Sequence, residues 1–213
     1  MKRYFADVAV LVRKDLLLEL RSRETVPAML LFVVGALVVF HFALPDSAGD
    51  DAARGLLWIA ILFTALLGLA RAYSAEREQG VLDGLVLAPC DRSAIWVGKT
   101  VAVFVFLLLM EAIALPVFAL FYAPVSGAMV AAILLADVGI AAVGTLLSAM
   151  ALASRTRELI LPLLFMPLAI PLVIGGAGAS IAEEPGRFIV FLGLYDAIFA
   201  IICWASFEYV VTE

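Results

Sequence analysis

Charge is scarce in this sequence. Only 15% of its 213 residues are Asp, Glu, Lys or Arg, whereas 65% are hydrophobic. Soluble globular domains carry about 25% charged and about 45–50% apolar residues, and a chain of this length cannot bury such an apolar excess. The mean hydropathy of +1.13 indicates the same. The composition therefore excludes soluble catalytic folds, disordered tails and nucleic-acid binders, and indicates a membrane protein.

Cysteine and histidine are also scarce, which argues against several kinds of site. Cys90 precedes an apolar stretch and Cys203 lies inside another, so their expected difference in depth rules out a disulfide within one chain. His41 is the only histidine, and alone it is more typical of an interfacial residue than of a zinc or haem ligand. The sequence has no Ser/His/Asp set and no carboxylate pair of the glycosidase type. We predict no catalytic residue, no metal site and no directly bound cofactor.

Long charge-poor stretches occupy most of the chain. At about 1.5 Å per helical residue they are about 24 to 44 Å long, against about 30 Å for the hydrocarbon layer of a membrane. Arg54 and Arg71 flank the shortest stretch and can extend to the two interfaces. We predict an all-α, single-domain integral membrane protein whose six transmembrane helices cover residues 26–44, 55–70, 100–122, 125–153, 159–182 and 188–207.

The distribution of Lys and Arg predicts the orientation of these helices. Residues 1–24 hold six of the fourteen, residues 71–99 hold four and residues 155–157 hold two, which leaves Arg54 and Arg187 for the opposite side. Because short loops rich in Lys and Arg resist translocation, the richer side faces the cytoplasm. Both termini are therefore expected in the cytoplasm.

The first 24 residues predict an amphipathic helix on the cytoplasmic membrane surface. Apolar residues from Phe5 to Leu20 recur at intervals of three or four, opposite a charged face. Such a helix is either a passive lead-in or a brace that takes part in a transport cycle, and the pattern leaves both open. The residues that define it are Arg3, Phe5, Val12, Lys14, Leu16 and Arg21.

The connection over residues 71–99 is the candidate coupling segment. Gly80 and Pro89 bound a short piece with apolar side chains on one face, which a soluble partner could hold in a groove, and mixed charges lie on both sides of it. An ordinary interfacial loop helix is the alternative. The candidate contact residues are Glu76, Arg77, Glu78, Gly80, Leu82, Asp83, Leu85, Pro89, Asp91 and Arg92.

Residues 93–100 come close to a phosphate-binding loop but lack its first glycine. They also lead into a membrane span, whereas a phosphate-binding loop follows a parallel strand. We therefore interpret Lys99 as a cytoplasmic anchor whose ammonium group extends to the membrane surface.

Three acidic residues lie inside the predicted spans: Glu111, Asp137 and Asp196. Charged groups at this depth cost roughly 2.5–3.5 kcal/mol, so these side chains should face protein or water, and they are predicted to form one layer near mid-membrane. Small residues share the helix faces of Asp137 and Asp196, which indicates that both point at other helices. They are either protonated packing groups or part of a proton relay or substrate contact.

Proline and glycine are concentrated in the stretch over residues 159–182. Three prolines, the last at Pro171, remove backbone donors, and three glycines from Gly175 onward follow them. We expect a bent span that ends in a short turn back into the outer leaflet.

Several short motifs occur along the whole chain. They are KDL at residues 14–16, ELRSRE at 19–24, ERE-x-G-x-LDGL-x-LAP at 76–89, DRSAI at 91–95, GK at 98–99, LPL at 161–163, PL at 171–172 and YD at 195–196. These motifs resemble the CcmB family of membrane subunits, which belongs to the bacterial ABC transporter of cytochrome c maturation, the haem exporter. More broadly the chain is similar to permeases of the ABC-2 exporter type, which place an interfacial helix before six spans.

This resemblance implies an assembly in the bacterial inner membrane. A dimer of the subunit would sit on a CcmA-type ATPase dimer that binds ATP and magnesium, beside a CcmC-type haem-handling subunit and a small CcmD-type subunit. ATP hydrolysis would release a haem-loaded CcmE-type chaperone, so haem is handled by the complex. The chain would then be a non-catalytic permease subunit. The alternatives are a stand-alone ion-coupled carrier and a non-transporting scaffold for haem-handling membrane proteins.

Overall fold

The computed structural model describes residues 2–45, 49–73, 91–152 and 157–210. This part of the chain is all-helical, and six of its helices are long and apolar enough to cross a membrane, which confirms the predicted fold class. The helices are α1 (Lys2–Ser22), α2 (Thr25–Ala43), α3 (Gly49–Arg71), α6 (Arg92–Phe121), α7 (Gly127–Leu152), α8 (Arg157–Ile181) and α9 (Gly186–Val210).

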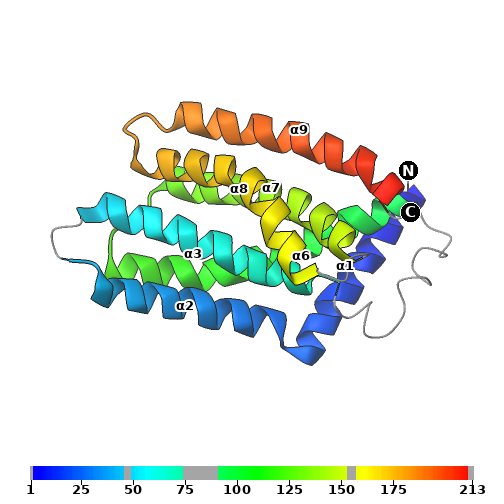
Figure 1. Ribbon diagram of the computed structural model, residues 1–213, viewed down its shortest axis with the longest axis horizontal. Coiled ribbons are helices and arrows are strands. Elements are labelled where there is room, and N and C mark those ends of the chain that lie inside the picture. The colour runs from blue at the N-terminus through cyan, green and yellow to red at the C-terminus, as the bar shows by residue number, and fades with distance from the viewer. Residues whose placement is uncertain (1, 46–48, 74–90, 153–156, 211–213) are drawn as a thin grey trace.

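The six apolar helices run side by side, and α1 lies across one end of the bundle (Figure 1). Helix α7 is at the centre, because it packs against α3, α6, α8 and α9, and 67% of its apolar window is buried. In α2 the corresponding share is 17%, which leaves most of that helix for lipid or another subunit. The start of α1 and the end of α9 lie at the same end, which we call the basic end.

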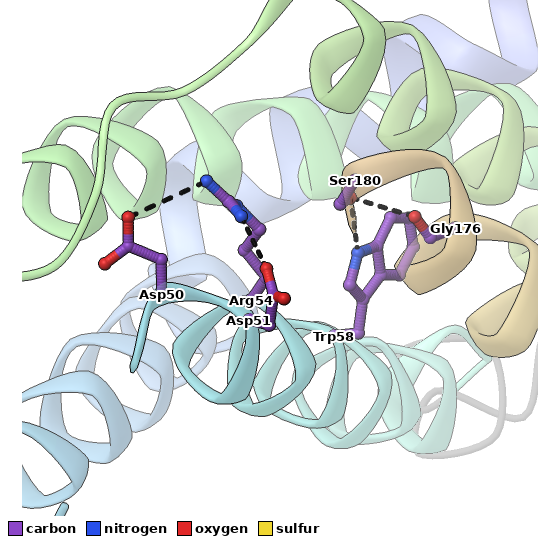
Figure 2. Close-up of polar contacts among 6 residues, drawn as sticks. All are labelled: Asp50, Asp51, Arg54, Trp58, Gly176 and Ser180. Atoms are coloured by element: carbon purple, nitrogen blue, oxygen red, sulfur yellow. Dashed lines mark hydrogen bonds and ion pairs between the residues drawn. The ribbon is translucent and has the colours of Figure 1, made fainter. Parts of the chain in front are cut away.

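Two helices begin earlier than the sequence predicted. Helix α3 begins at Gly49 because Asp50 and Asp51 in its first turn pair with Arg54 at 4.0 Å and 2.8 Å (Figure 2). Helix α6 begins at Arg92, so residues 92–99 continue the third span. Both predictions stopped at charged residues, whereas these charges are satisfied locally and the helix continues through them.

Helix α8 also differs from the prediction. It bends along its length but continues through its three prolines to Ile181, so the predicted turn back into the outer leaflet is wrong (Figure 1). Its glycines serve close packing: a Cβ atom on Gly176 would lie 2.1 Å from Cη2 of Trp58. The indole Nε1 of Trp58 donates to Ser180 Oγ at 3.0 Å, and that hydroxyl donates to the Gly176 carbonyl at 2.8 Å (Figure 2).

Candidate functional site

A cavity of about 440 Å³ lies at the basic end, beneath the corner between α1 and α2. Apolar, hydroxyl, acidic and basic side chains all line it. The residues around it come from α1, the α1–α2 corner, α3 and α6: Asp15, Leu18, Glu19, Ser22, Glu24, Thr25, Gly68, Arg71, Ala72, Lys99, Ala102, Val103 and Phe106.

Lys99 is buried in the wall of this cavity, which corrects its interpretation as a surface anchor. Its Nζ lies 3.1 Å from both carboxylate oxygens of Asp15 and donates to the Ala72 carbonyl at 2.7 Å. The side chains of Lys99 and Asp15 are only 6% and 7% exposed. Lys99 therefore satisfies its charge inside the protein and ties α1 to α3 and α6.

Two further contacts hold α1 against α6. Near the start of α1, a hydrogen bond of 3.2 Å joins the hydroxyl groups of Tyr4 and Ser93. One turn before the ion pair, Leu11 occupies the space above Gly98, where a Cβ atom would lie 2.8 Å from Cβ of Leu11. Because residues 93–100 are helical and packed against α1, they cannot form a phosphate-binding loop.

The rest of α1 presents the residues that the sequence assigned to a membrane-surface helix. Phe5 and Leu20 are 67% and 69% exposed, whereas Val12 and Leu16 are half-buried. Arg3 and Arg21 are exposed, and Lys14 is half-buried with its Nζ 3.0 Å from Asp15. Helix α1 therefore has one face on the bundle and a second, partly apolar face outside it.

The α1–α2 corner is held by Glu19. Its carboxylate accepts the backbone N–H groups of Thr25 and Val26 at 2.9 Å and 2.8 Å, and so caps the start of α2. The chain turns at Arg23, whose φ of 52° is in the left-handed region. Across the corner, Arg71 of α3 donates to the Glu24 carbonyl at 3.1 Å.

The sequence analysis did not single out Asp15, Glu19 or Lys99 as site residues. One sequence feature could have identified Asp15 and Glu19. They lie four residues apart on α1, and both fall beside its apolar stripe, which they interrupt. Acidic groups in such positions need a partner inside the fold.

Replacing Glu19 by alanine is expected to destabilise the protein by about 1 kcal/mol, because two donors at the start of α2 lose their acceptor. Glu19→Gln keeps an acceptor and removes only the charge, so it should destabilise the protein by only a few tenths of a kcal/mol. Thermal unfolding of the purified variants in detergent measures both. Equal stability of Glu19→Ala and the unmodified protein would contradict the capping role.

Most of the predicted coupling residues, from Glu76 to Pro89, lie outside the described residues. Of the remaining two, Asp91 is exposed and accepts the Ser93 backbone N–H at 3.0 Å, so it caps α6. Arg92 is half-buried and is the first residue of that helix. The candidate coupling segment therefore runs directly into α6.

The three intramembrane acids are all buried, but they do not form one cluster. Glu111 and Asp137 are neighbours that interact across the α6–α7 contact. The carboxyl group of Asp196 lies over another position on α7, where a Cβ atom on Gly139 would be 2.6 Å from it. Gly139 is only about 3 Å along α7 from Asp137, so Asp196 lies close to the depth of the pair but on another face of α7.

His41 lies among aromatic rings at the end opposite α1. Its ring centroid is 5.0 Å from that of Phe121 and 5.7 Å from that of Tyr122. Within the described ranges, His, Cys, Asp and Glu form no group of three that could hold a metal ion.

Six apolar helices, with a charged helix packed across one end, define a multi-pass membrane protein. Comparison with known proteins narrows the class. The sequence matches the family described as CcmB protein over residues 6–206, so the chain belongs to that family.

Relatives of similar length support this assignment. The Rhodobacter capsulatus protein named heme exporter protein B is 31% identical over 206 residues, which cover 92% of this chain and 94% of the relative. The protein of the same name from Paracoccus denitrificans is 31% identical over 193 residues, covering 86% and 88%. The Pseudomonas aeruginosa relative is 28% identical over 182 residues, covering 83% and 81%.

Proposed function

We propose that this chain is the membrane subunit of a haem-export ABC transporter and that a separate cytoplasmic ATPase drives it. The observation that carries the proposal is the match to the CcmB protein family over nearly the whole chain, together with relatives named heme exporter protein B. The permease subunit itself is non-catalytic, and its partner binds ATP and magnesium.

The basic end is proposed to face the cytoplasm of a bacterium, with the protein in the inner membrane. Exposed arginines on α1 and at the α1–α2 corner gather there, whereas Arg54 and Arg187 lie near the starts of α3 and α9 at the opposite end. Short segments rich in Lys and Arg are retained in the cytoplasm. The second, partly apolar face of α1 would rest on the membrane surface.

Helix α6 supplies a route from the ATPase to the membrane interior. Its 30 residues extend about 45 Å, which exceeds the hydrocarbon layer by about 15 Å. A force applied to the segment before Arg92 would reach the middle of the bundle through a continuous helix. The Lys99–Asp15 pair would move α1 with it, which makes α1 a brace.

The assembly proposed for this chain contains two copies of it on a CcmA-type ATPase dimer, with CcmC-type and CcmD-type subunits beside them. Its output is the delivery of haem through release of a haem-loaded CcmE-type chaperone. The family's relatives support haem as the cargo by name. Nucleotide hydrolysis by a co-purifying ATPase that requires this subunit would separate the proposal from an ion-coupled carrier and from a passive scaffold.

Reversing the charge of Glu78 while changing Leu82 or Leu85 to aspartate is expected to abolish association with the ATPase, because the partner would lose both its apolar contact and its orienting charge. Membrane insertion should be unchanged. Pull-down of the ATPase from detergent-solubilised membranes measures association. The amount of subunit in the membrane measures insertion. Normal recovery of the complex would contradict the coupling assignment.

A further inference from the structure

Glu111 and Asp137 form a pair of acidic side chains in the interior of the spanning bundle. Their exposed fractions are 3% and 0%, and their carboxyl groups interact across the contact between α6 and α7. Glu111 lies about 28 Å along α6 from Arg92 and about 15 Å from Phe121 at its other end. The pair is therefore at the depth of the hydrocarbon layer.

No basic side chain is placed to neutralise this pair among the described residues. Lys99 is about 18 Å away along α6 and pairs with Asp15 of α1. In the other spanning helices, Lys, Arg and His occur only in the two terminal turns at either end. The titratable groups carried by α2, α3 and α9 are His41; Asp50, Asp51, Arg54 and Arg71; and Arg187, Tyr195, Asp196, Cys203, Glu208 and Tyr209. Only Tyr195, Asp196 and Cys203 of these lie away from the helix ends.

Three of the four carboxyl oxygens of the pair also lack hydrogen-bond partners among the described residues. Glu111 Oε1 and both carboxyl oxygens of Asp137 are buried and have no partner in the part of the chain that the structure describes. Burying an ionised carboxylate is strongly unfavourable unless it is paired, and two adjacent carboxylates also repel each other. The pair therefore cannot carry two negative charges, and a proton between the two groups would satisfy both deficits.

We propose that Glu111 and Asp137 form a proton-binding site, which always holds one proton between its carboxyl groups and takes up and releases a second. The two groups titrate as a unit, so the exchange belongs to the pair. Residues of this type inside membranes serve proton relays, and the contact between α6 and α7 sets the distance between the two groups. The site does not depend on nucleotide or on the cargo, so it and the proposed ATPase coupling can fail separately.

Infrared spectroscopy of the full-length protein in lipid tests the site, because protonated carboxyl groups have a carbonyl stretching band separate from that of carboxylates. The measured quantity is the loss of this band in the Glu111→Gln/Asp137→Asn double variant relative to the unmodified protein. We expect a loss equivalent to one carboxyl group in mildly alkaline buffer and to two groups in acidic buffer. The band should shift in D₂O.

Three results would overturn the proposal. In the first, the double variant and the unmodified protein have the same protonated-carboxyl band in mildly alkaline buffer. In the second, the band lost in the double variant is equally large in acidic and alkaline buffer. In the third, the size of the lost band changes with sodium concentration at constant pH. If the double variant is not recovered as a monodisperse protein, Glu111→Gln alone decides, because it should remove the pH-dependent part of the band.

Asp196→Asn is the matched control for this experiment. Asp196 is also buried and its oxygens also lack hydrogen-bond partners among the described residues, but it lies over Gly139 on another face of α7. The variant removes the contribution of one carboxyl group and should leave the pH-dependent contribution of the Glu111–Asp137 pair intact. Loss of that contribution in Asp196→Asn would contradict the assignment to the pair.

Discussion

A protein with methionine in place of Lys99 is expected to be about 3 kcal/mol less stable to unfolding. The change leaves Asp15 buried without its main counter-charge and leaves the Ala72 carbonyl without its donor. Breaking a buried pair from one side typically costs about 3–5 kcal/mol. The lower value applies here because Lys14 remains 3.0 Å from Asp15. Thermal unfolding in detergent, followed by tryptophan fluorescence, measures the loss.

The matched control for this prediction removes both charges. In the Lys99→Met/Asp15→Leu double variant no buried charge is left unpaired, so most of the lost stability should return. Lys14→Met is a second control. The Lys14 side chain is 33% exposed, so its loss should destabilise the protein less than the loss of Lys99. If Lys99→Met is as stable as the unmodified protein, the ion pair does not hold α1 in place.

Replacing Gly176 by valine is expected to prevent the native packing of α8 against α3. The added Cβ would lie 2.1 Å from Trp58 Cη2, and the indole ring is only 1% exposed, so it has no space into which to move. Overpacking a core typically costs about 1–3 kcal/mol, and this site is at or above the upper limit because the nearest atoms belong to a rigid ring. The yield of monodisperse protein from membranes measures the effect.

Two variants separate this clash from a general effect of losing glycine. Gly35→Ala adds the same Cβ on α2, where nothing lies within 4 Å, and should leave the yield unchanged. Combining Gly176→Ala with Trp58→Phe shortens the opposing ring and should recover part of the yield lost by Gly176→Ala alone. Recovery no better than that of the single variant would show that the close approach to Trp58 is not the cause.

The architecture could be predicted from the sequence because the membrane imposes a strong and local pattern. A helix that crosses the hydrocarbon layer needs about 20 apolar residues in succession, and this signal does not depend on neighbouring helices. The starts of α3 and α6 could not be predicted in this way. Their first turns contain charges, and whether such charges end a helix depends on partners such as Asp51 for Arg54.

The basic end was less predictable because its contacts connect distant parts of the chain. Lys99 on its own has the sequence context of a surface anchor, and only its pairing with Asp15, 84 positions away, makes it an interior residue. By sequence alone, the glycines after Pro171 likewise predict a turn, because their packing partners are distant in the chain. The ring of Trp58 that requires Gly176 belongs to a helix far from it in sequence.

The ion pair between α1 and α6 also has a consequence for biogenesis. Asp15 leaves the ribosome long before Lys99, so during synthesis the first helix exists without its binding surface while α2 and α3 enter the membrane. Its final position can be reached only after residues 93–99 of α6 have been made. The nascent chain therefore completes its basic end late, and a polypeptide truncated before residue 99 would retain α1 as an undocked segment.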